Sequence, residues 1–78
     1  MQHKFKEIGR VKLTDNQELV VSLVDGERLD IRIWISGSRY SGPTKRGVRF
    51  YLFDERWDGF WELMKKVNES YREIVHSL

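Results

Sequence analysis

Residues 18–35, ELVVSLVDGERLDIRIWI, contain two apolar segments that flank Asp25 and Gly26. An Asp-Gly pair between apolar runs is the strongest short-range signal for a β-hairpin, because both residues tolerate the positive φ angles of a tight turn. The stretch therefore predicts two paired antiparallel strands.

The second strand of this hairpin alternates between two kinds of side chain. Successive side chains of a strand point to opposite faces, so its aliphatic residues should share one face and meet the core. Arg32 and Trp34 then lie together with Asp30 on the other face, which has no evident hydrophobic role. The aliphatic set is Leu29, Ile31, Ile33 and Ile35.

The segments on either side of the hairpin are less regular. Residues 3–8 (HKFKEI) alternate weakly before a glycine and predict a short first strand, and residues 10–18 are rich in turn formers and predict a connection. Residues 36–47 (SGSRYSGPTKRG) predict an irregular loop because of their Gly, Ser and Pro content. Residues 48–53 (VRFYLF) then predict a fourth strand.

The fourth strand has aromatic residues on both faces. Val48, Phe50 and Leu52 alternate with a second set that begins at Arg49 and includes Tyr51 and Phe53. Alternation alone leaves open whether the aromatics of that second set pack beneath another subunit or stack on a ligand.

From Asp54 onward the apolar period changes from two to about three and a half, which predicts a long amphipathic helix capped by Asp54. A helix of about 24 residues spans roughly 36 Å, which is longer than so small a sheet is wide. The far part of its apolar stripe needs a partner, and a twofold-related copy is the simplest one. The predicted dimer interface is Trp61, Met64, Tyr71, Ile74, Val75 and Leu78.

Seventy-eight residues predict one domain, residues 1–78, of the α+β class with the order β-β-β-β-α. The absence of cysteine excludes disulfides and thiolate metal sites, and His3 and His76 lack the spacing of a metal pair. We therefore expect no metal and no cofactor. With no long apolar run, we expect no membrane association and an intracellular location, in the cytoplasm with the nucleoid or in a eukaryotic nucleus.

Positive charge is concentrated in the first two thirds of the chain. Residues 1–53 contain ten Lys/Arg and six Asp/Glu, whereas residues 54–78 contain four and six. Residues 31–53 contain five cations, no acidic residue and five aromatic residues, which indicates a polyanionic partner. The alternative is a solvated basic face. The cations are Arg32, Arg39, Lys45, Arg46 and Arg49, and the aromatics are Trp34, Tyr40, Phe50, Tyr51 and Phe53.

Three segments taken together resemble a known family: LDIRIW at residues 29–34, TKRGVRF at 44–50 and DERWDGFWELM at 54–64. Their order and spacing resemble the C-terminal single-stranded-DNA-binding domain of the transcriptional coactivator positive cofactor 4 family, in a compact form similar to prokaryotic or viral members. The resemblance covers roughly residues 5–70. It departs from the family in an acidic turn, DGE at residues 25–27, where lysines are usual, and in the spacing before the helix.

This resemblance implies a homodimer whose curved sheets form a basic, aromatic-lined surface for single strands. Arg32 is similar to the family's DNA-contacting strand arginine, and Trp34 lies within one position of its aromatic platform. Lys45 and Arg46 resemble the basic pair before the family's glycine, here Gly47. The predicted binding residues are Arg32, Trp34, Arg39, Tyr40, Lys45, Arg46 and Arg49.

The leading hypothesis is therefore sequence-tolerant binding of single-stranded DNA, of RNA or of unpaired regions of a duplex, in transcription, replication or repair. The alternative is a protein-interaction module that docks an acidic partner in a transcription or replication assembly. Catalysis is disfavoured because Ser36, Ser38 and Ser41 have no histidine near them in the sequence to activate them.

Overall fold

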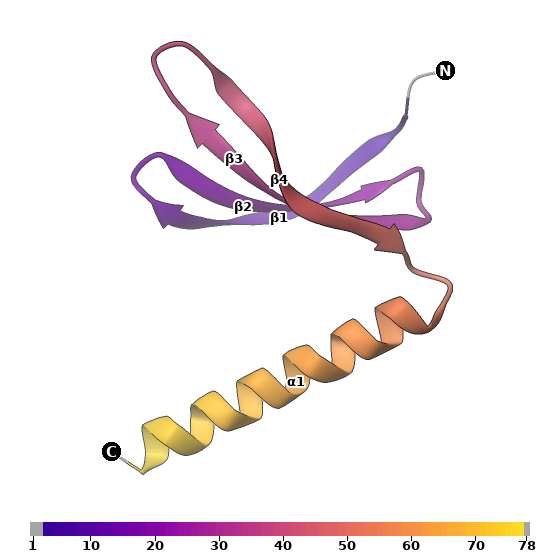
Figure 1. Cartoon of the computed structure of the whole chain (residues 1–78), viewed down its shortest axis with the longest axis vertical. Coiled ribbons are helices and arrows are strands. Elements are labelled where there is room, and N and C mark those ends of the chain that lie inside the picture. The colour runs from indigo at the N-terminus through magenta and orange to yellow at the C-terminus, as the bar shows by residue number, and fades with distance from the viewer. Residues whose placement is uncertain (1–2, 78) are drawn as a thin grey trace.

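The structure, a computed structural model that describes residues 3–77, contains one four-stranded antiparallel sheet and one helix (Figure 1). The strands follow one another in the sheet in chain order, and the helix comes last, which confirms the predicted fold class. The elements are β1 (Phe5–Thr14), β2 (Gln17–Val24), β3 (Arg28–Ser36), β4 (Ser41–Tyr51) and α1 (Glu55–His76).

The central hairpin forms as its sequence predicts. Asp25 and Gly26 both have positive φ angles, 57° and 70°, and the Glu27 amide donates to the Val24 carbonyl at 3.1 Å. β2 and β3 pair without interruption from Gln17 opposite Ile35 to Val24 opposite Arg28. The turn chemistry thus fixes the register of the strand pair at the centre of the sheet.

The first strand is longer than predicted. β1 continues past Gly9 to Thr14, and only Asp15 and Asn16 form the turn to β2. The register shifts between Glu7 and Gly9, so the glycine lies at an irregularity within the strand and does not end it. The prediction of a connection over residues 10–18 was wrong because a bulge interrupts the alternation there while the strand itself continues.

The predicted loop over residues 36–47 was also wrong in extent. β4 begins at Ser41, so only residues 37–40 connect β3 to β4. Pro43 is tolerated in this strand because β4 lies at the edge of the sheet, where a missing amide proton breaks no ladder. Gly47 is required by packing, because a Cβ there would lie 2.2 Å from the Ile31 carbonyl oxygen.

The two faces of the sheet differ in burial from expectation. Val20 and Val24 are fully buried, yet the register puts them on the face of Asp30, Arg32 and Trp34, here called the polar face. On the opposite, aliphatic face Leu29 is buried, whereas the other aliphatic residues of β3 are only half-buried. The side chains of the polar face thus bury Val20 and Val24, and the sequence analysis did not predict these two residues as part of the core.

Helix α1 begins at the predicted cap, where the Asp54 side chain accepts a hydrogen bond from the Arg56 amide at 3.0 Å. Its first turns contact β4 through Phe60 and Phe50, whose ring centroids lie 5.6 Å apart. Phe50 lies opposite Leu29, so this contact is on the aliphatic face. The rest of α1 extends away from the sheet (Figure 1), and no described residue of α1 is buried.

The chain exposes much surface for its size. Its accessible area is 6659 Å², whereas a folded monomer of 9.4 kDa is expected to expose about 5,000 Å². The radius of gyration is 15.2 Å, against about 11.5 Å for a compact domain of this length.

Among residues 3–77, no helix combines the length and apolar character needed to cross a membrane.

Candidate nucleic-acid interface

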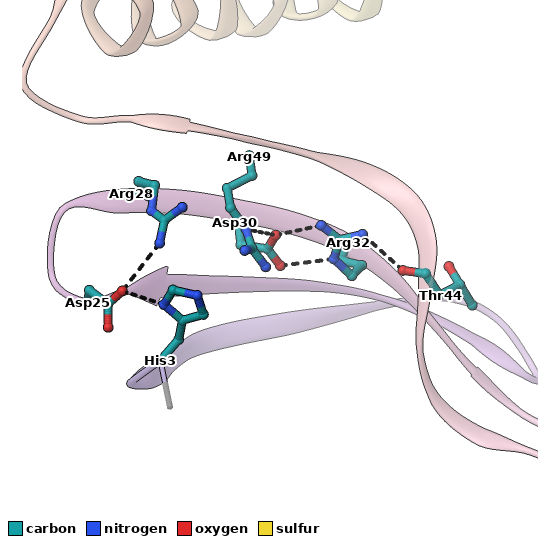
Figure 2. Close-up of polar contacts among 7 residues, drawn as sticks. All are labelled: His3, Asp25, Arg28, Asp30, Arg32, Thr44 and Arg49. Atoms are coloured by element: carbon teal, nitrogen blue, oxygen red, sulfur yellow. Dashed lines mark hydrogen bonds and ion pairs between the residues drawn. The ribbon is translucent and has the colours of Figure 1, made fainter. Parts of the chain in front are cut away.

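A buried carboxylate organises the centre of the polar face. Asp30 is 4% exposed and lies between two arginines of the predicted site (Figure 2). Arg32 donates to it from Nη2 at 2.8 Å and from Nε at 3.2 Å, and Arg49 donates from Nε at 3.1 Å. Arg32 also donates from Nη1 to the Thr44 carbonyl at 3.0 Å. Arg32 and Arg49 are therefore held in place by the protein itself.

Electrostatics at this cluster favour the ionised states of Asp30 and Arg32. Burial would raise the pKa of Asp30, but the hydrogen bonds from Arg32 and Arg49 outweigh it, so the pKa of this carboxyl lies below its usual range. The hydrogen bonds to Asp30 raise the pKa of Arg32. One carboxylate thus compensates part of the positive charge of two arginines, and neither guanidinium offers a full charge to a ligand.

Trp34 lies on the polar face, as the alternation predicts. The Arg10 guanidinium from β1 lies 5.0 Å from the centroid of its ring, in a cation–π contact. Arg10 is held in turn by Glu7 and, at 3.2 Å, by Glu18. The indole therefore has a fixed neighbour on one side, which orients it for a ligand on another.

The basic pair lies in an irregular part of β4. Gly47 pairs with Arg32 and Pro43 pairs with Trp34, so β4 advances four residues while β3 advances two. The extra residues bring Lys45 and Arg46 to the bend of the strand. Bulges of this kind re-aim side chains and are common beside binding sites.

Beyond this bend, the ends of β3 and β4 project away from the β1–β2 hairpin (Figure 1). We call residues 36–46 the basic arm. Its cations Arg39, Lys45 and Arg46 form no ion pair with any other residue in the part of the chain that the structure describes. Tyr40 is half exposed and donates its hydroxyl to the Pro43 carbonyl, which fixes the ring against the arm.

A cavity of about 540 Å³ on the polar face collects four of the seven predicted binding residues. Arg32, Trp34, Lys45 and Arg49 line it. The other three predicted residues, Arg39, Tyr40 and Arg46, do not line the cavity and belong to the basic arm. The predicted site therefore has two parts, a cavity on the sheet and an exposed part on the basic arm, and Lys45 belongs to both.

The acidic turn at residues 25–27 is also part of an internal network (Figure 2). Asp25 accepts hydrogen bonds from the Lys4 amide at 2.9 Å and from Arg28 at 3.2 Å, and its carboxylate lies 2.8 Å from His3. The backbone hydrogen bond from Lys4, followed by the contact with His3, lowers the pKa of Asp25. This carboxylate joins the start of the chain to the central hairpin.

Tyr51 and Phe53 are exposed, and their rings stack with centroids 6.4 Å apart. Tyr51 pairs with Arg28 across the sheet, so it lies on the polar face, and the Arg28 guanidinium is 5.8 Å from its ring. Phe53 lies in the short connection after β4. The two stacked rings therefore lie at the end of the polar face near Arg28. Whether they contact a ligand or a second subunit is the question that alternation leaves open.

Sequence reasoning missed several residues that line the cavity or lie beside it. Asp30 was placed on the correct face but not as the partner of both arginines, although its spacing of two from Arg32 was a usable signal. Arg10 was missed because it depends on the cross-strand register of a segment read as a connection. Phe5 and Ser22 also line the cavity, and nothing in their local sequence indicates it.

Five of the six predicted dimer residues lie on α1 and are exposed in the single chain: Trp61, Met64, Tyr71, Ile74 and Val75. Leu78 lies outside the described residues. The first of them also stacks with Trp57, at a centroid distance of 6.1 Å. The stripe thus runs from an aromatic cluster near the sheet to the open end of the helix.

Comparison with known proteins gives no match: no protein-family model, no curated protein and no solved structure is significantly similar to this chain. The resemblance to the positive cofactor 4 family therefore stays a prediction.

Proposed function

We propose that this chain is a single-stranded DNA-binding protein that acts as a homodimer. The observation that carries the proposal is the basic arm, where Arg39, Lys45 and Arg46 lack an acidic partner among the described residues and lie beside an exposed tyrosine. Single strands offer phosphates to be neutralised and base faces to be stacked, and a basic groove with aromatic rings meets both needs without reading sequence.

In this proposal the two parts of the site have different tasks. The cations of the basic arm neutralise phosphates, and Tyr40 and Trp34 supply stacking surfaces. Arg32 and Arg49 are compensated by Asp30, so they contribute shape and hydrogen-bond donors more than net charge. This division refines the prediction in which all five cations are binding residues.

A second copy covers the apolar stripe of α1. The surplus of exposed surface, about 1,600 Å² above that expected for a monomer of this mass, supports this part of the proposal. A typical stable interface buries about 800 Å² on each partner, so the surplus is large enough to supply one. Pairing of α1 with its own copy leaves the polar face, on the other side of the sheet, open to a strand.

Competition binding separates this function from its alternative, a module that docks an acidic protein. A labelled single strand bound to the protein is challenged with unlabelled single-stranded oligonucleotide, with duplex of the same length and with heparin, at equal charge. The proposal expects the single strand to compete best. Heparin or duplex competing as well as the single strand would contradict it and favour a general docking surface for polyanions.

A further inference from the structure

The cavity on the polar face has the size of a small-ligand site. Its volume of about 540 Å³ lies within the range of 300–1,000 Å³ typical of ligand pockets. Residues from all four strands line it, so its shape is fixed by the sheet and not by a loop.

The floor of the cavity carries a polar group without a partner. Ser22 is only 7% exposed and lines the cavity, yet its hydroxyl makes no hydrogen bond within residues 3–77. The hydroxyl itself is reached by solvent, since Arg28 Nε is the one fully buried side-chain nitrogen or oxygen without a partner among residues 3–77. Its neighbour across the strand pair, Asp30, has its carboxylate occupied by two arginines. A ligand that enters the cavity therefore finds the Ser22 hydroxyl available.

Three apolar residues line the cavity together with polar and charged ones. Trp34, Phe5 and Pro43 line the cavity, and the Arg49 guanidinium lies 5.4 Å from the centroid of the Phe5 ring. Arg49 uses its Nε for Asp30, so its terminal Nη donors are left for a ligand. Arg10 covers part of Trp34 but does not line the cavity, so another part of the indole faces into it.

We propose that this cavity accepts one nucleobase from the bound strand. The inference rests on the proposed function and adds a base-binding subsite to it. A planar ring fits between apolar walls, with Ser22 and Arg49 as hydrogen-bonding groups at its edge and Lys45 at the rim for the adjoining phosphate. The terminal Arg49 groups can only donate, so a base with a carbonyl oxygen on its pairing edge is favoured. Thymine and guanine have this oxygen where adenine has an amino group.

The test uses three strands of equal length: oligothymidylate, oligodeoxyadenylate and an abasic strand that keeps the phosphates. The wild-type protein is compared with Ser22→Ala, which removes the hydroxyl, and with Ser22→Leu, which fills the cavity. We expect Ser22→Leu to lose about tenfold in affinity for oligothymidylate and nothing for the abasic strand. The wild-type protein should prefer oligothymidylate to oligodeoxyadenylate because of Arg49, and Ser22→Ala should weaken binding of oligothymidylate but not of the abasic strand.

Unchanged oligothymidylate affinity in a folded Ser22→Leu protein would overturn the inference, as would equal losses on the abasic strand. Binding of no strand by the wild-type protein would instead reject the proposed function. If Ser22→Leu does not fold, an NMR titration of the wild-type protein with thymidine monophosphate tests whether a base binds in the cavity. Shifts of the Ser22 amide and the Trp34 indole NH support the subsite, and shifts confined to the basic arm contradict it.

Discussion

Asp30 on β3 and Arg49 on β4 are joined by a hydrogen bond of 3.1 Å, and Arg32 completes the cluster from the other side of the carboxylate. Asp30 lies directly opposite Arg49 on the adjacent strand and two residues from Arg32 on its own strand. The cluster therefore ties the edge strand β4 to the centre of the sheet, and it positions both arginines at the cavity. Stability and binding are linked through one buried carboxylate.

Replacement of Asp30 by Asn should destabilise the protein. The amide keeps the size of the carboxylate but loses its charge, so two arginines lose their charged acceptor, and the free energy of unfolding should fall by about 1–3 kcal/mol. Urea denaturation measures the change. Asp58→Asn on α1 is the matched control, since Asp58 is exposed and should shift stability by less than about 0.5 kcal/mol. Equal effects of the two substitutions would contradict a structural role for the cluster.

Stability should also depend on pH in the acidic range. The pKa of Asp30 is lower in the folded protein than in the unfolded chain, so its ionised form contributes stability that is complete above the ordinary carboxyl pKa of about 4. That contribution is lost as the pH falls through the lowered folded pKa. The pKa values of Glu7 and Asp25 are lowered too, by a hydrogen bond from Arg10 and from the Lys4 amide respectively, and act in the same direction.

Denaturation midpoints of the wild-type protein and Asp30→Asn, measured between about pH 6 and pH 2, test this dependence. The wild-type midpoint should fall more steeply than that of the variant, because the variant lacks one of the linked carboxyls. Parallel curves would mean that Asp30 has the same pKa in the folded protein and in the unfolded chain, which would contradict the prediction.

Gly47→Ala should weaken the attachment of β4. The added methyl group would lie 2.2 Å from the Ile31 carbonyl oxygen and 2.8 Å from the Arg32 Cα, so the two strands would have to separate. Overpacking of this kind costs about 1–3 kcal/mol. Gly9→Ala is the matched control in another strand, because nothing lies within 4 Å of a Cβ there. Thermal melts that show a smaller loss for Gly47→Ala than for Gly9→Ala would refute the close approach.

The stripe on α1 gives a prediction about assembly. Ile74 is 60% exposed in the single chain, and Ile74→Lys should convert a dimer to a monomer because it places a charge in the middle of the proposed contact. Glu73→Lys is the control, since helical spacing puts residue 73 on the opposite face. Sedimentation equilibrium measures the mass. A wild-type protein that is already monomeric at high concentration would exclude the homodimer.

Much of the fold follows from local patterns. The Asp25-Gly26 turn and the change of period at Asp54 identify the central hairpin and the helix, because both depend on residues close together in the chain. The extents of β1 and β4 do not follow from such patterns. Gly9 and Pro43 predict breaks, but pairing with a neighbouring strand continues through a bulge and along an edge, and this tertiary context outweighs local propensity.

The candidate site was predictable only in part, for a related reason. Alternation places Arg32 and Trp34 on one face, and composition locates the basic arm. The side chains that complete the site come from other strands. Arg49 on β4 donates a hydrogen bond to Asp30, and the Arg10 guanidinium on β1 lies over the ring of Trp34. Such contacts depend on the register between strands, which a single sequence does not give for β1 and β4. The cavity and its unpartnered serine appear only when all four strands are in place.

The most direct test of the central claim is the salt dependence of affinity for single-stranded oligonucleotide. The variant Lys45→Ala/Arg46→Ala is compared with the wild-type protein and with Lys65→Ala/Lys66→Ala, which removes the same charge from α1. The logarithm of the wild-type association constant should fall linearly with the logarithm of salt concentration, by about 0.7 per phosphate contact. The arm variant should have a slope shallower by about 1.4, and the helix variant should keep the wild-type slope. A wild-type slope near zero, or equal effects of the two variants, would contradict the assignment of strand binding to the basic arm.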